Sequence, residues 1–133
     1  METVNIVFDE NRRLLIVPLD SWIADPAQEF AALAPAWTAA DILEAKNNFA
    51  RLIAFGSCLE ICCVGPRSEE LHDALDEIIE DCGQLSVVTT SQNDPTEGCD
   101  YFLRLSGGRP KLLVTFASAN PELVQTLVGI IGV

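Results

Sequence analysis

Apolar residues occur along this chain in short uninterrupted runs, separated by longer amphipathic stretches. Aliphatic and β-branched residues dominate the runs LLIV, LEICCV, LSVV and KLLVTF. Continuous apolar runs are typical of strands covered on both faces, and strands separated by helices favour parallel βαβ units. The pattern therefore predicts one α/β domain over residues 1–133. Its three layers would enclose an open, mostly parallel five-stranded sheet of the Rossmann or flavodoxin type.

The predicted elements follow one another with no visible linker. Strands are expected at 3–8, 14–19, 58–64, 85–90 and 111–116, and helices at 26–33, 39–54, 68–81, 95–105 and 121–131. The first two strands are joined by the short polar stretch ENRR, which predicts an antiparallel hairpin at one end of the sheet.

One arrangement recurs four times where a strand is expected to give way to a helix. An apolar run ends, a short polar stretch follows, and a residue-proline pair opens a helical pattern. Proline suits the first turn of a helix, and an Asp, Asn or Ser beside it can cap the free amides. The predicted caps are Asp25, Ser68, Asp94 and Asn120. Thr38 and Asp41 fit a capping box for the helix at 39–54.

The carboxyl ends of parallel strands are where open α/β sheets usually bind ligands. The residues expected at that edge are Gly65, Arg67 and Ser68, then Thr89 to Asn93 with Thr90 among them, and Ala117 to Asn120. They are either a small-molecule site or ordinary caps and turns. Neither GxGxxG after a strand nor GxxxxGK[ST] is present, so no nucleotide motif supports the first interpretation.

Charge narrows the classes of partner. The chain has twenty acidic and eight basic residues, for a net charge of -12. This charge disfavours binding to nucleic acid and to anionic membrane surfaces. The amino terminus lacks the pattern of a secretory signal, and the apolar carboxyl terminus is shorter than the roughly 20 residues that span a bilayer. We therefore expect a cytoplasmic protein. Its five cysteines, without paired spacing, fit reduced thiols.

The helix at 68–81 is strongly acidic and has no base after Arg67. Its predicted binding face consists of Glu69, Glu70, Asp73, Asp76, Glu77 and Glu80. Acids at the carboxyl end of a helix oppose its dipole, which suggests a docking face for a basic protein; a solvated face is the alternative. The first functional hypothesis is thus a non-catalytic protein-binding module, such as an immunity-type protein or accessory inhibitor. The second is a small-ligand-binding domain or enzyme using the strand-end edge.

Candidate chemistry is sparse. His72, the only histidine, precedes Asp76 by one helical turn, close enough for a hydrogen bond, but a metal site needs further ligands. Cys62 and Cys63 should point to opposite faces of their strand, so with Cys58 they cannot hold one metal. Cys63 with His72 is the only pair that resembles an activated nucleophile. We assign no catalytic residue, metal or cofactor from the sequence.

Glu60 interrupts the apolar run CLEICCVG. A buried carboxylate needs a partner or becomes neutral. We expect Glu60 near the entry of its strand, where it would reach solvent or a cation such as Lys46 or Arg51.

The run VGPRSEELHDALDEII, followed by VVTTSQNDP and CDYFL, resembles a small bacterial α/β domain family of unknown function. In that family a helix bearing HDxxDE leads to a VVTT strand and another helix. The likeness covers residues 57–105. Aromatic and histidine residues follow the TT pair in the family, whereas Ser91 and Gln92 stand there in this chain. The resemblance implies a shared fold and transfers no activity. The apolar last helix leaves open whether the protein forms a homodimer.

Overall fold

A computed structural model of the protein describes residues 4–20, 22, 25–54, 57–116 and 120–132. Its sheet has six strands in the order β1-β2-β6-β3-β4-β5. The strands are β1 (Val4–Phe8), β2 (Arg12–Ile16), β3 (Phe30–Pro35), β4 (Cys58–Val64), β5 (Val88–Gln92) and β6 (Leu112–Thr115). The helices are α1 (Ala39–Ala54), α2 (Ser68–Cys82), α3 (Pro95–Arg104) and α4 (Pro121–Ile131), with a 3₁₀ turn η1 (Ser106–Gly108). Only β1 and β2 pair antiparallel, so the predicted class and hairpin are confirmed.

The helix predicted at 26–33 is wrong, and the sheet consequently has six strands rather than five. Residues 30–35 form β3, which lies between β6 and β4 in parallel register. Its sequence FAALAP is rich in helix-forming residues, but every residue from Phe30 to Ala34 is buried. Pairing on both sides and burial on both faces therefore override the local helical preference.

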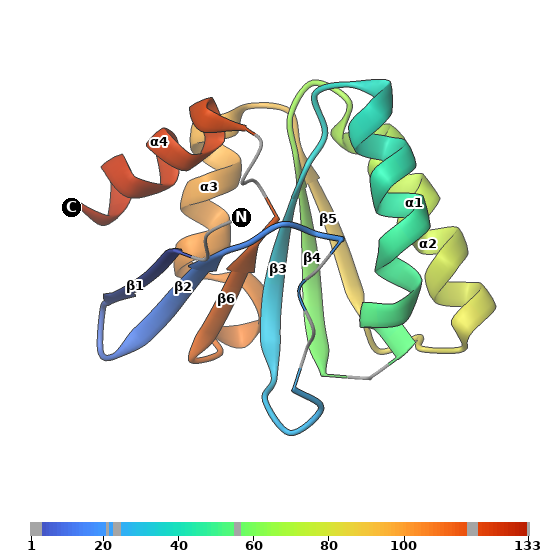
Figure 1. The fold of residues 1–133 in the computed structure, drawn as a ribbon, viewed down its shortest axis with the longest axis horizontal. Coiled ribbons are helices and arrows are strands. Elements are labelled where there is room, and N and C mark those ends of the chain that lie inside the picture. Colours follow the sequence, from blue (N-terminus) through green and yellow to red (C-terminus); the bar gives the residue numbers. More distant parts are fainter. Residues whose placement is uncertain (1–3, 21, 23–24, 55–56, 117–119, 133) are drawn as a thin grey trace.

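Helices α1 and α2 cover one face of the sheet, and α3 and α4 cover the other (Figure 1). The apolar sides of α1 and α2 bury Phe49, Leu52, Leu71 and Leu75 against one face. On the other face α3 and α4 bury Phe102, Leu103, Leu123 and Leu127. The sheet is thus the middle layer of three, as the continuous apolar strands predicted.

The order in which the chain visits the strands reverses between β3 and β6. From β3 the chain passes through α1 to β4 and through α2 to β5, moving steadily away from β6 along one face. It then crosses by α3 on the opposite face to β6, which pairs with β3 on the other side. The connections that leave β3 and β6 thus lead to helices on opposite faces, α1 and α4 (Figure 1). Such a topological switch point leaves a crevice at the carboxyl ends of the two strands.

Two of the four predicted helix caps are confirmed. Oδ1 of Asp94 accepts from the amides of Thr96 and Glu97, and Oδ1 of Asn120 accepts from the amide of Leu123. Ser68 is not a cap: it is the first residue of α2, after Arg67. Asp25 caps a turn that leads into β3 rather than a helix.

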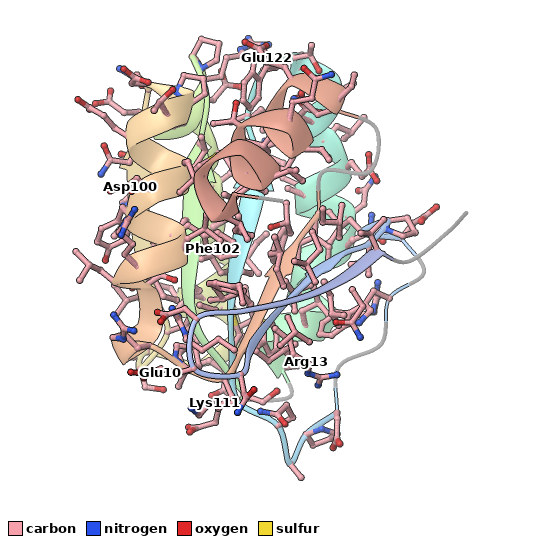
Figure 2. All side chains as sticks on the ribbon, turned by 90° about the vertical axis from the view of Figure 1, so that its left-hand side faces the viewer. Glu10, Arg13, Asp100, Phe102, Lys111 and Glu122 are labelled. Carbon is pink, nitrogen blue, oxygen red and sulfur yellow. The ribbon has the colours of Figure 1, made fainter. Side chains whose placement is uncertain are left out.

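The hairpin β1-β2 lies beside α3 and α4 and turns through Glu10 and Asn11, which both have positive φ (Figure 2). Arg12, the first residue of β2, is buried. Its guanidinium donates to the carbonyl of Leu103, in the last turn of α3, at 2.6 Å and to the carbonyl of Pro110 at 3.1 Å. Arg12 thereby ties the hairpin to the carboxyl end of α3, where the helix dipole favours a cation. Within the described residues, no helix is long and apolar enough to cross a membrane.

Candidate functional site

A cavity of about 380 Å³ opens at the topological switch point. Small-molecule sites commonly have volumes of roughly 300–1,000 Å³. Its walls come from the end of β3, from the segments that follow β2, β3 and β6, from one side of α1 and from the first residue of α4. The residues that line it are Pro18, Leu19, Asp20, Ala34, Pro35, Trp37, Thr38, Asp41, Glu44, Ala45, Phe49, Phe116, Asn120 and Pro121. We call this the switch-point cavity.

The segment after β2 is held in place by Arg51, from the last turn of α1. The guanidinium donates to the carbonyl of Leu19 at 2.6 Å and to the carbonyl of Trp22 at 2.5 Å. Beneath the cavity, the ring of Phe116 stacks edge-on with those of Trp22 and Phe49, at centroid distances of 5.8 and 5.4 Å. These contacts give the cavity a floor of packed aromatic rings.

The amino terminus of α1 is capped by its own side chains. Oδ2 of Asp41 accepts from the amides of Trp37 and Thr38 at 2.9 and 3.1 Å, and Oγ1 of Thr38 accepts from the amide of Asp41 at 3.2 Å. The predicted capping box is therefore confirmed. At α4, the carboxamide oxygen of Asn120 accepts a hydrogen bond from the amide of Leu123, and Pro121 has no N–H group.

The predicted ligand edge is divided in two by the fold. Of its residues, Asn120 lines the switch-point cavity. Gly65, Arg67 and Ser68 lie instead at the junction of β4 and α2, where Oγ of Ser68 donates to Oδ1 of Asn93 at 2.7 Å. Ala117 to Ala119 lie outside the described residues.

The side chain of Thr90 is engaged away from the edge, with Glu60. Glu60 is only 5% exposed and lies on the face of the sheet that α3 covers. Its Oε2 accepts from Thr90 at 3.0 Å and from the hydroxyl of Tyr101 at 2.8 Å, and its Oε1 accepts from the amide of Gly107 at 2.8 Å. The expectation that Glu60 reaches solvent or a cation is wrong, because α1, which carries Lys46 and Arg51, covers the opposite face.

The carboxylate of Glu60 affects the tyrosine beside it. Burial, then the hydrogen bond to Glu60 and its negative charge, raise the pKa of Tyr101 well above its usual value near 10. Tyr101 therefore remains a hydrogen-bond donor to Glu60 at neutral pH. The polar cluster of Glu60, Thr90, Tyr101 and Gly107 joins β4, β5, α3 and η1.

His72 lies between α2 and the edge strand β5. Its Nδ1 is 3.3 Å from Oδ2 of Asp76, and its Nε2 is 3.1 Å from Oγ1 of Thr89. Thr89 also donates to Oδ1 of Asp76, which closes a triangle of three side chains. The predicted contact between His72 and Asp76 is confirmed. Among the described residues, no three His, Cys, Asp or Glu side chains converge as a metal site would require.

The five cysteines are free thiols, as predicted. Cys62 and Cys63 pack into different cores on the two faces of the sheet, which confirms their predicted orientation. Burial raises the pKa of Cys63, and the negative charge of Asp76 raises it further. The thiolate that a nucleophile needs is therefore strongly disfavoured at Cys63.

The predicted acidic face of α2 lies largely in solvent. Exposed on this helix are Glu69, Glu70, Asp73, Glu77 and Glu80. Asp76 is half-buried and bound to Thr89 and His72. Arg67 forms an ion pair with Glu70 at 3.2 Å, and the last turn of α2 contains no base.

Most residues of the switch-point cavity were not predicted as site residues. Thr38 and Asp41 appeared only as a capping box, and Asp20, Glu44 and Phe116 had no assigned role. The signal was present in the sequence WTAAD: a capping box directly after an apolar run marks a strand-to-helix junction. With a helix expected at 26–33, no strand precedes this junction, and the sequence alone does not reveal the crevice.

No protein-family model matches the chain, and no curated protein matches it.

Proposed function

We propose that this protein binds a small molecule in the switch-point cavity. The observation that carries the proposal is the position of the cavity, at the carboxyl ends of β3 and β6 where the connections diverge to opposite faces. Open α/β sheets bind ligands at this point because neighbouring loops separate there. The proposal concerns binding rather than catalysis. Among the described lining residues, Thr38 is the only one with a hydroxyl, and it caps α1.

A cavity-filling substitution tests this proposal. Ala45 is buried on α1 and lines the cavity, so we expect Ala45→Leu to occupy the ligand volume. Ala40→Leu makes the same change at an exposed position of the same helix and is the matched control. A fragment set of cationic, neutral and anionic compounds would be screened by ligand-observed NMR, with hits located through the indole resonance of Trp37.

Fragments that bind in the cavity should lose binding in Ala45→Leu and keep it in Ala40→Leu. The proposal fails if no fragment perturbs Trp37, or if the two variants bind equally well.

A second function, docking of a basic protein on α2, is favoured by the exposure of Glu69, Asp73, Glu77 and Glu80 without a compensating base in the last turn. An immunity-type or accessory inhibitor of a basic target is the corresponding biological role. The cytoplasmic location and the homodimer stay predictions.

Neutralising this face should weaken capture of a basic partner from native lysate, and weaken it most at low salt. The variant changes Glu69, Glu77 and Glu80 to Gln and Asp73 to Asn. The matched control removes the same number of charges elsewhere by changing Glu10, Glu29, Glu97 and Glu122 to Gln. Equal capture by the two variants, or capture of contaminants only, argues against α2 as the docking face.

A further inference from the structure

We infer that the ligand of the switch-point cavity is an organic cation, a small amine joined to an apolar or aromatic body. This inference rests on the proposed function and specifies its ligand class. Three features of the cavity carry it: the charges on its walls, the state of the two helix amino termini that reach it, and its aromatic surface.

The charged groups on the cavity walls are all negative. Asp20, Asp41 and Glu44 line the cavity, and none of the described lining residues is Lys, Arg or His. The surrounding protein carries a net charge of -12 and reinforces the negative potential. Arg51 of α1 is not among the lining residues, and its Nη1 and Nη2 donate to the carbonyls of Trp22 and Leu19. A ligand with a positive charge is therefore attracted, and an anion is repelled.

Capping side chains make the amino termini of α1 and α4 less favourable for an anion than uncapped helix ends. Phosphates bind at such positions because free backbone amides point at them. Here the carboxylate of Asp41 covers the amides of Trp37 and Thr38, and its negative charge in the first turn of α1 repels an anion. At α4, Asn120 caps the helix and Pro121 lacks an N–H. The charged groups that line the cavity are thus all acceptors, which match a ligand that donates hydrogen bonds.

Acceptor groups remain for an ammonium to bind. The two capping bonds of Asp41 use Oδ2, and within the described part of the chain no hydrogen bond reaches its Oδ1. Glu44 stands one turn later on the same side of α1 and is exposed. Its carboxylate likewise has no protein donor among the described residues, so the two side chains can share one ammonium group.

Aromatic side chains give the cavity an apolar surface. Trp37, Phe49 and Phe116 line it, and the last two stack edge-on at a centroid distance of 5.4 Å. Such rings bury an apolar body, and their faces attract cations. An amine joined to a hydrocarbon or aromatic group can bind the carboxylates and pack against the rings. An inorganic cation would bind the carboxylates without burying an apolar group against the rings.

Three probes of nearly equal size separate charge from shape: phenethylamine, 2-phenylethanol and 3-phenylpropionate. Each would be titrated into the full chain at physiological salt and followed through the Trp37 indole and Asn120 carboxamide resonances. We expect phenethylamine to bind at least roughly tenfold more tightly than 2-phenylethanol, since a hydrogen bond to a charged group adds about 1.5–3 kcal/mol. 3-Phenylpropionate should bind most weakly of the three.

Glu44→Gln keeps the shape of the wall and removes one charge. It should weaken the binding of phenethylamine several-fold and leave the binding of 2-phenylethanol unchanged. Glu69→Gln, on α2, should change the affinity for neither compound.

Equal binding of the amine and the alcohol, or preferred binding of the carboxylate, overturns the cation assignment and leaves a ligand site in place. Amine-induced shifts on α2 instead of at Trp37 also overturn it. If none of the probes and no compound of the fragment set perturbs Trp37, the proposed function itself fails.

Discussion

Replacing Glu60 by leucine is expected to destabilise the protein by about 3–5 kcal/mol. Leucine leaves the amide of Gly107 and the hydroxyls of Thr90 and Tyr101 without their acceptor. Replacing Glu60 by glutamine should destabilise the protein far less. Its carbonyl oxygen can accept from Gly107, while its amide group donates to the two hydroxyls, which are free to rotate. The free energy of unfolding in urea measures both effects.

The charge of Glu60 has a second, spectroscopic consequence. Tyr101 is the only tyrosine, so phenolate absorbance at alkaline pH reports on this one residue. Because the folded-state pKa of Tyr101 is raised, its contribution to stability is fully present below about pH 10 and declines as the pH rises toward the folded-state pKa. In Glu60→Gln, phenolate should form at lower pH in the native protein. An unchanged titration, or a leucine variant as stable as the glutamine variant, contradicts this account of the cluster.

The partners of Glu60 explain why its environment could not be predicted from the sequence. Tyr101 and Gly107 lie 41 and 47 positions away along the chain. Besides the thiol of Cys62, which lies 3.6 Å from Oε2, the run CLEICCVG contains none of the neutral donors that converge on this carboxylate. Burial without a cation became evident only once the fold placed α3 and η1 against β4. The sequence did identify Glu60 as the anomalous residue of its strand.

Features set by local physical chemistry were predictable. The boundaries of α1, α4 and β4 agree with those expected, because caps, prolines and apolar runs define them within a few residues. Asp94 and Asn120 cap their helices for the same reason. In β3, by contrast, the local sequence favours a helix, but the segment forms a strand. Phe30 to Pro35 is extended because β4 and β6 pair with it, and those pairings involve distant residues.

The switch-point cavity depended on that same segment. Asp20, Glu44 and Phe116 come from three separate regions of the chain and meet only because β3 lies beside β6. With 26–33 interpreted as a helix, the strand order could not be derived, and neither could the point at which it reverses. Functional sites of this kind follow from topology, so one misassigned central strand conceals the whole site.

Replacing Gly65 by alanine is expected to cost at least about 3 kcal/mol of stability, combining positive-φ strain with a steric clash. Gly65 follows β4 with a φ of +132°, a conformation that L-residues rarely adopt. A Cβ there would lie 2.7 Å from the carbonyl oxygen of Ala36 and 2.9 Å from the ring of Trp37. The carbonyl cannot withdraw freely, because it accepts from the amide of Arg67 at 2.8 Å.

Gly83→Ala is the matched control. Gly83 also has a positive φ, +71°, but a Cβ there meets no atom within 4 Å, so only the backbone strain of about 1 kcal/mol should appear. The difference between the two variants in urea unfolding reports the contact with Ala36 and Trp37 together with the greater backbone strain at a φ of +132°. Because Trp37 lines the switch-point cavity, Gly65→Ala should also shift the Trp37 indole resonance in the folded protein, and Gly83→Ala should not. Equal destabilisation by the two substitutions contradicts the close approach of β4 to the segment after β3, on which the shape of the cavity depends.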